Sequence, residues 1–399
     1  MNKKVFVAAT ILVPILISIL AIVQIVDLAK AESQTIIVPD NYPTIQQAIN
    51  NASEGDTIYV RKGVYVENPI VNKSVSLIGE DRDATIIDVT AGLAVESNSV
   101  TLSGFTIYDG RRGISLSGNH CSISGNKITD STNGIVLFGC EKNSITGNTF
   151  KSIGLSSAIQ LNFANRNLVN NNLIYSCVEG IQLREGSSNN ILTGNTIVNC
   201  QDVAIRLLGS NLGSKWLGPD NNSIMQNEIS SSGCGTTIYG ANGNIISNNN
   251  YVYNTVQFLA NEDYYLSFGY NRSINTINGN FWSDYKGKDA NGDEVGDLPY
   301  IIDAFNKDNY PLMRPISTPS PTNPTPSPIV FPNTTPTPTP SPSPSPTLEP
   351  SLEPTQTATP TNDDKQTLDL TPVLVLSGIV MIAVVVGALV YSRRRNSRR

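Results

Sequence analysis

Three charged side chains, Glu179, Asp202 and Arg206, have the types and spacing that could support chemistry. Two carboxylates beside an arginine can transfer protons or bind the carboxylates of uronate sugars. Alternation along the repeat described below predicts Gln182 and Arg206 on one strand face. The residues at the edges of this face are Glu179, Arg184, Glu185 and Asp202. We therefore take Glu179, Asp202 and Arg206 as catalytic candidates, and Arg184 and Arg206 as ligand-binding candidates. A solvated ion-pair network between neighbouring coils is the alternative interpretation.

Aromatic residues form a second group of candidates. Trp216, Tyr264 and Tyr265 fall in two segments, residues 208–220 and 262–272, that interrupt the repeat. Flat rings on an exposed edge can stack on the apolar faces of sugars. We therefore expect a carbohydrate-binding edge, and a hydrophobic plug for the C-terminal end is the alternative.

A short acidic segment has the spacing of a calcium loop. It resembles the loops of EF-hand type, in which hard oxygen ligands surround one Ca²⁺ ion. It departs from that pattern by a glutamate at position 6 and a tyrosine at position 12. A structural calcium site and a metal-free acidic turn both remain open. The oxygen-bearing side chains at positions 1, 3, 5 and 9 are Asp289, Asn291, Asp293 and Asp297.

Two of the five cysteines have related positions. Cys177 and Cys200 each follow an equivalent isoleucine by three residues, which stacks them in adjacent coils. Stacked cysteines lie within disulfide reach, and an oxidising compartment would permit the bond. A disulfide and a pair of buried thiols are both compatible with this spacing.

Composition excludes several classes of function. The chain of 399 residues carries 27 Lys and Arg against 33 Asp and Glu, a formal charge of −6. Nucleic-acid binding depends on dense Lys and Arg, so we expect no nucleic-acid partner. One histidine and five cysteines leave few ligands for a zinc cluster or a multi-histidine copper site.

The two ends of the chain predict its location. Lys3 and Lys4 precede an uncharged run over residues 5–26, and residues 29–31 (AKA) then form a small-x-small cleavage pattern. This arrangement is typical of a secretory signal over residues 1–31. An uncleaved anchor is the alternative. Residues 370–391 carry no charge and are long enough to span a membrane, and five arginines follow in residues 392–399. We expect a single-pass protein of the cell membrane, with the bulk of the chain extracellular.

The segment between the ends is a repeat. Three short apolar segments recur about every 22–24 residues, and apolar residues alternate within each, as in Ile181 and Leu183. This period and alternation predict an all-β parallel β-helix with three short strands per coil. A leucine-rich repeat would need helical segments, which are absent from the pattern. Asparagines recur at one turn and should form a ladder between coils: Asn126, Asn148, Asn172 and Asn195.

The open N-terminal end of such a solenoid needs a cap. Thr44 and Gln47 form a capping-box pattern, and Ile45, Ala48 and Ile49 lie on one helical face, so we predict a short capping helix. The predicted organisation is a signal peptide (1–31), an N-terminal cap with the first strands (32–69), β-helix repeats (70–280), a C-terminal cap (281–314), a disordered Pro/Ser/Thr-rich stalk (315–369), a transmembrane helix (370–391) and a basic tail (392–399).

Several segments resemble a known superfamily. Residues 42–49 (YPTIQQAI), 55–60 (GDTIYV) and 63–67 (GVYVE) look like the N-terminal segments of pectin-lyase-like proteins. The Asn/Gly coils resemble the family named after carbohydrate-binding proteins and sugar hydrolases, which includes NosD-like proteins. Residues 279–285 (GNFWSDY) through 308–313 (DNYPLM) are similar to the segment that closes many NosD-like surface proteins. The resemblance covers roughly residues 35–314 and implies a right-handed parallel β-helix.

The resemblance does not decide the activity, because this fold hosts lyases, hydrolases, esterases and non-catalytic binders. Gly63, Tyr65 and Glu67 match a pattern of pectin methylesterases, but the other esterase motifs are missing, so we interpret the match as structural. The resemblance to NosD-like proteins implies a link to copper-enzyme maturation, yet one histidine and four methionines argue against a copper site. Our leading hypothesis is a membrane-anchored surface protein that binds carbohydrate or a cell-envelope glycan without catalysis. A surface polysaccharide lyase or hydrolase and a structural or adhesive envelope protein are the alternatives.

Overall fold

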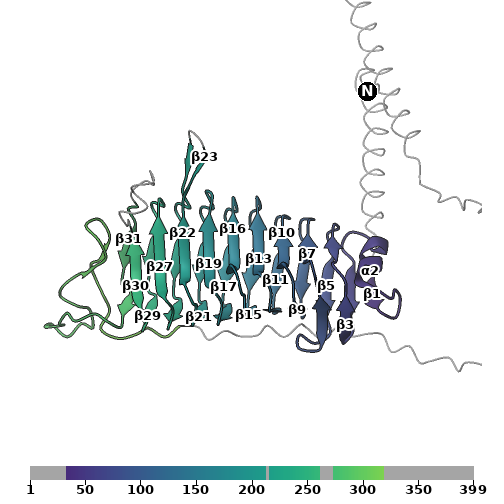
Figure 1. The fold of residues 1–399 in the computed structure, drawn as a ribbon, viewed down its shortest axis with the longest axis horizontal. Coiled ribbons are helices and arrows are strands. Elements are labelled where there is room, and N and C mark those ends of the chain that lie inside the picture. The colour runs from purple at the N-terminus through teal and green to yellow at the C-terminus, as the bar shows by residue number, and fades with distance from the viewer. Residues whose placement is uncertain (1–32, 213–214, 261–272, 319–399) are drawn as a thin grey trace, which may run out of the picture. The chain divides into compact units, whose positions relative to one another are not determined.

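A computed structural model describes residues 33–212, 215–260 and 273–318 of the chain. These residues wind into a parallel β-helix whose coils each contribute one strand to three long sheets (Figure 1). Neighbouring strands in each sheet follow one another in successive coils, as expected of a solenoid. The predicted period of about 22–24 residues is therefore confirmed as the number of residues in one regular coil.

Sheet A has thirteen strands: β1 (Thr35–Val38), β2 (Thr57–Val60), β5 (Ser76–Gly79), β8 (Thr101–Ser103), β11 (Ser122–Ser124), β14 (Ser144–Thr146), β17 (Leu168–Asn170), β20 (Ile191–Thr193), β25 (Ser223–Met225), β28 (Ile245–Ser247), β31 (Thr276–Asn278), β34 (Lys307–Asp308) and β33 (Tyr300–Ile301). Sheet B has ten: β3 (Gly63–Val66), β6 (Thr85–Asp88), β9 (Thr106–Tyr108), β12 (Lys127–Thr129), β15 (Thr149–Lys151), β18 (Leu173–Tyr175), β21 (Thr196–Val198), β26 (Glu228–Ser230), β29 (Asn250–Val252) and β32 (Phe281–Trp282). Sheet C has nine: β4 (Ile70–Val71), β7 (Leu93–Val95), β10 (Arg112–Leu116), β13 (Asn133–Phe138), β16 (Ser157–Asn162), β19 (Glu179–Arg184), β22 (Val203–Leu208), β27 (Cys234–Tyr239) and β30 (Val256–Ala260).

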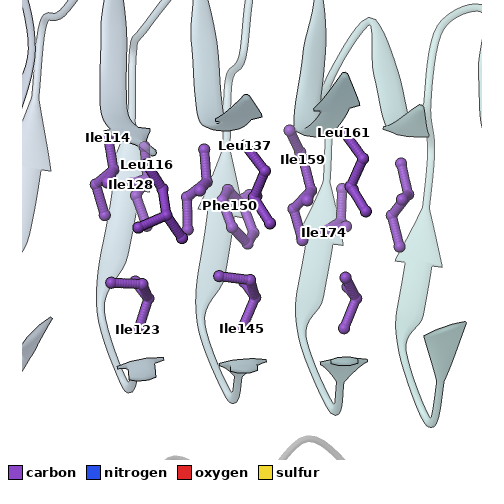
Figure 2. Packing of buried hydrophobic residues seen from close by; sticks show 14 of the residues in the cluster. Ile114, Leu116, Ile123, Ile128, Leu137, Ile145, Phe150, Ile159, Leu161 and Ile174 are labelled. Atoms are coloured by element: carbon purple, nitrogen blue, oxygen red, sulfur yellow. The ribbon is translucent and has the colours of Figure 1, made fainter. Parts of the chain in front are cut away.

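The core consists of aliphatic columns inside the three sheets. Equivalent residues pair directly between coils, as Ile159 does with Ile181 and Leu161 with Leu183. All four side chains are fully buried, and Figure 2 shows Ile159 and Leu161 among the residues pointing inward. Burial of like residues in register stabilises each coil against the next, because stacked side chains of one shape leave few voids.

Two columns of asparagine side chains bond coil to coil. In each column the Nδ2 group of one asparagine donates to the Oδ1 atom of the asparagine in the next coil. Asn172, for example, donates to Asn195 over 2.9 Å and accepts from Asn148 over 3.2 Å. The sequence analysis predicted the first ladder, but it missed the second. Ladder 1 contains Asn126, Asn148, Asn172, Asn195, Asn227, Asn249 and Asn280; ladder 2 contains Asn143, Asn167, Asn190, Asn222, Asn244 and Asn275.

A short helix, α2 (Ile45–Asn51), packs at the N-terminal end of the solenoid against β1, β2 and β4. The Thr44 hydroxyl accepts from the Gln47 amide, as the capping-box pattern predicts. Glu67 accepts from the first two helical amides, those of Ile45 and Gln46, both over 2.9 Å. A carboxylate at a helix N-terminus accepts hydrogen bonds from the free N–H groups and interacts favourably with the positive end of the helix dipole. The interpretation of Glu67 as structural agrees with these contacts.

The C-terminal end continues the sheets beyond residue 280. Strands β32 and β34 extend sheets B and A, and β33 pairs antiparallel with β34. Trp282 stacks on Tyr251 with ring centroids 4.4 Å apart and on Tyr300 with centroids 4.3 Å apart. Strands β1 to β3 lie within residues 32–69, for which a cap and the first strands were predicted.

Within the described ranges, no helix is long and apolar enough to cross a membrane. The signal segment 1–31 and most of the stalk, together with the span at 370–391 and the tail at 392–399, lie outside those ranges.

Candidate functional site

The outer face of sheet C is the widest regular surface on which side chains could meet a ligand. Its central strands run for five or six residues, whereas their counterparts in sheets A and B run for three. Outward-facing residues align between coils, because Gln160 pairs with Gln182, and Gln182 pairs with Arg206. The predicted placement of Gln182 and Arg206 on one strand face is therefore confirmed.

Glu179, Asp202 and Arg206 come together on this face. The Nη2 atom of Arg206 lies 3.1 Å from Glu179 Oε1 and 2.6 Å from Asp202 Oδ2. The side chains of Arg206 and Glu179 are only 13% and 14% exposed, whereas that of Asp202 is 56% exposed. Oε2 of Glu179 also accepts from Ser157 and Gln182, each over 2.9 Å. Both oxygens of Glu179 are thus engaged by donors, which leaves neither free to exchange a proton without losing a bond.

Arg184 lies in a different part of sheet C from this cluster. It lines a groove of about 510 Å³ that crosses β10, β13, β16 and β19. The lining combines the guanidinium groups of Arg112 and Arg184 with the carboxylate of Glu185, uncharged polar side chains and apolar surface. In the described part of the chain, neither arginine forms an ion pair with an acidic side chain. The Nε atom of Arg184 is buried and lacks a hydrogen-bond partner there. The lining residues are Arg112, Ser115, Ser117, Val136, Phe138, Gln160, Asn162, Arg184 and Glu185.

An amide chain orders the floor of the groove. Asn133 donates to Gln160 over 3.1 Å, and Gln160 donates to Asn162 over the same distance. Phe138 is 57% exposed at one edge, and its ring meets the ring of Phe163 edge-on with centroids 5.8 Å apart. Fixed amides, unpaired guanidinium groups and an exposed ring suit the hydroxyl, carboxylate and apolar faces of sugars.

Most of the residues that line this groove were not predicted from the sequence. Arg112, Phe138 and Asn162 were not among the candidates, although the strand register aligns Phe138 with Asn162, and Asn162 with Arg184. The signal was present in the repeat, since Phe138, Asn162 and Arg184 each follow the inward leucine of their coil. Arg112 stands at the opposite end of its strand, where only the register reveals that it shares the face.

Trp216 does not form an open binding platform. The insertion at 208–220 folds as an antiparallel hairpin of β23 (Ser210–Leu212) and β24 (Lys215–Leu217), which projects from the solenoid in Figure 1. The Trp216 indole N–H donates to the Gly240 carbonyl over 2.8 Å. A Cβ atom at Gly209 or Gly240 would overlap the ring, so both glycines are required for its packing. The ring holds the hairpin against the next coil. Tyr264 and Tyr265 lie outside the described residues.

The predicted calcium loop is occupied by its own backbone. Asp289 accepts from the amides of Gly292, Asp293 and Glu294, and Asp297 accepts from the amide of Ala290. Asn291 donates to Asp293, whose other oxygen accepts from Val295. In the described ranges no group of three His, Cys, Asp or Glu side chains is placed to hold an ion. The calcium prediction therefore has no support, because these oxygens serve the turn itself.

The predicted disulfide between Cys177 and Cys200 is not formed. None of the five cysteines, all of which lie in the described ranges, forms a disulfide, and all five are buried. Burial raises the pKa of Cys177 to about 11 and that of Cys200 to about 12, which keeps both protonated at neutral pH. Of the two arrangements that the spacing allowed, the structure has the buried thiols, since both sulfurs are packed as small apolar groups inside the solenoid.

Comparisons with known proteins bear on the family. A family model described as periplasmic copper-binding protein (NosD) matches residues 49–287. The comparison with curated proteins found no significant match. Similar solved structures include the A-module of Azotobacter vinelandii mannuronan C-5 epimerase AlgE6 (17% identity, 59% of this chain and 81% of that one, TM-score 0.41). A PL6 alginate lyase in complex with a trisaccharide is 14% identical over 68% of this chain and 65% of that one, with a TM-score of 0.47. The catalytic domain of a GH87 alpha-1,3-glucanase is 15% identical over 70% and 50%, with a TM-score of 0.40. At these identities and scores they carry no argument about function.

The residues of this chain do not fit the copper of the matched description. Copper sites use histidine nitrogen, thiolate or thioether ligands gathered around one ion. The only histidine, His120, is an exposed residue at a turn, and the five thiols are buried.

Proposed function

The chain belongs to the NosD family, and we propose that its parallel β-helix binds a carbohydrate along the outer face of sheet C without altering it chemically. The observation that carries the proposal is the groove in which Arg112 and Arg184 lie without acidic partners in the described part of the chain. Unpaired guanidinium groups beside fixed amides favour a saccharide that bears carboxylates, because such groups bind carboxylate oxygens in pairs.

The shape of the groove supports an extended ligand. It crosses four successive coils, so its polar groups recur at the coil spacing of about 4.8 Å. Its volume of about 510 Å³ lies within the range of small-molecule sites. A polymer can therefore lie across several coils and gain affinity from repeated weak contacts.

The neighbouring acidic cluster argues against catalysis. A glycosidase needs one carboxyl group that gives a proton and a second that attacks or activates water. Glu179 has both oxygens engaged, and Asp202 is paired with Arg206. We therefore assign this cluster to holding β19 and β22 in register, which is the ion-pair interpretation of the sequence.

Binding and turnover can be separated in one experiment with the full-length chain. Calorimetric titration with uronate and neutral oligosaccharides should show binding of the uronates, weakened by added salt, with no new reducing ends or unsaturated products. Failure to bind any member of a broad glycan panel would sink the proposal. Product release that Asp202→Asn abolishes would favour the alternative of a lyase or hydrolase.

We further propose that the solenoid is displayed outside the cell by the C-terminal span at residues 370–391. The support is the uncharged run and the five arginines that follow it. Protease treatment of intact cells should remove the solenoid and leave a small membrane fragment. Recovery of the whole chain in the soluble fraction would contradict this location.

A further inference from the structure

We infer that this member of a family named for copper binding does not hold copper in its folded state. Histidine and cysteine supply the strongest copper ligands, and the single histidine and all five cysteines of the chain lie within the described ranges.

The histidine stands alone. His120 occupies a turn with a φ of 57°, and its side chain is exposed. The residues described contain no cluster of three His, Cys, Asp or Glu side chains that could surround an ion with it. One imidazole on a surface binds copper weakly, since stable sites combine several ligands in a defined geometry.

The five thiols are buried, and four of them form hydrogen bonds within the solenoid. The exposure of their residues ranges from 1% to 8%. Four of them donate to backbone carbonyls, as Cys121 does to Ser97 over 3.3 Å and Cys177 does to Tyr175 over 3.4 Å. A metal would have to replace the thiol proton and reach a sulfur inside the solenoid. Burial also raises the pKa of Cys140 to about 12, which opposes formation of the thiolate.

The thioethers of the described residues do not form a copper site. Only Met225 and Met313 of the four methionines fall in the described part of the chain. They lie on separate elements, the former on β25 and the latter beyond β34, and each is half-buried. A methionine-rich copper site would need several such sulfurs on one surface.

The test uses the full-length chain in its folded and unfolded states. Each is incubated with Cu(I) under reducing conditions, or with Cu(II), then desalted in the presence of a competing chelator and analysed for metal. The folded chain should retain no stoichiometric copper, and its melting temperature should not rise with either ion, because a ligand of the native state would raise it. The same chain in denaturant should retain Cu(I) through its exposed thiols, which shows that the assay detects binding.

His120→Ala supplies the second arm. Folded wild-type and variant chains should behave identically. Copper retained by the folded wild type at about one equivalent, or a rise in its melting temperature that His120→Ala removes, would overturn the inference. Neither outcome depends on glycan binding, so this test stands apart from the proposed function.

Discussion

The side-chain amide of Asn280 donates to Oδ2 of Asp308 over 3.1 Å, and this contact ends ladder 1. Asp308 is fully buried and accepts four further bonds, from the amides of Gly279, Asn280 and Tyr310 and from the indole N–H of Trp282. From Asn148 to Asn280, every asparagine of ladder 1 accepts from one neighbour in the column and donates to the next. A carboxylate, which only accepts, is the side chain suited to the last position.

Asp308→Asn should therefore destabilise the solenoid. The NH₂ group of the new asparagine would face N–H donors, and the hydrogen bonds to a charged carboxylate would be lost. We therefore expect the free energy of unfolding to fall by about 2–4 kcal/mol. Denaturant unfolding measures it. Asp109→Asn, at an exposed turn, is the control and should change stability by less than about 0.5 kcal/mol. Equal effects of the two substitutions would contradict the role of Asp308 as the ladder terminus.

Two adjacent threonines of β27 should respond in opposite ways to replacement by valine. The Thr236 hydroxyl lies 2.9 Å from the buried hydroxyl of Tyr251, whereas the buried Oγ1 atom of Thr237 has no hydrogen-bond partner among the described residues. Thr236→Val should cost about 1–3 kcal/mol, because it leaves the tyrosine unsatisfied, while Thr237→Val should be neutral or stabilising by up to about 1 kcal/mol. Thermal unfolding of both variants decides the matter, and a loss of stability in Thr237→Val would show that its hydroxyl has a partner.

Glu67→Gln should weaken the N-terminal end. The neutral amide can accept from only one of the Ile45 and Gln46 N–H groups and loses the interaction with the helix dipole, so we expect a loss of about 1–2 kcal/mol. Hydrogen exchange at the amides of α2 should report the change first. Glu96→Gln, at an exposed site, serves as the matched control and should leave exchange in α2 unaltered.

Stability should fall at high pH through the buried thiols. Burial raises the pKa of Cys177 and Cys200 from about 9 to about 11 and about 12. Because the native state favours the protonated form, this contribution is complete below about pH 9 and is lost as the pH rises toward 12. Unfolding measured from pH 8 to 11.5 should show a smaller decline when both cysteines are replaced by alanine. An identical decline in the two chains would remove the thiols as its cause.

Arg184→Gln should weaken glycan binding without lowering stability. Arg184 forms no ion pair with the described residues, so its loss removes only a contact to a ligand, which we expect to reduce affinity for uronate oligosaccharides roughly 10- to 100-fold. Arg166→Gln is the control, since Arg166 pairs with Glu141 outside the groove. Calorimetry in low and high salt should show a salt dependence in the wild type that Arg184→Gln reduces. Equal loss of affinity in the two variants would argue for a nonspecific charge effect.

The periodicity of the sequence was enough to predict the solenoid fold. Inward columns such as Ile159 and Ile181, the outward position of Arg206 and ladder 1 all follow from one rule, because a fixed coil length brings like positions into contact whatever lies between. The same rule could have revealed ladder 2 and the alignment of Phe138 with Arg184, had every column been followed.

The tertiary structure alone decided the features that depend on side-chain direction and on non-repeating segments. Sequence spacing could not show that Trp216 packs on Gly240, that Asp289 accepts from its own turn, or that Cys177 and Cys200 form no disulfide with each other. In each case one polar or reactive group has several possible partners, and only the folded structure shows which of them lies within bonding distance. The sequence therefore determined which residues share a column, whereas packing and hydrogen-bond geometry decided which of them remain available to a ligand.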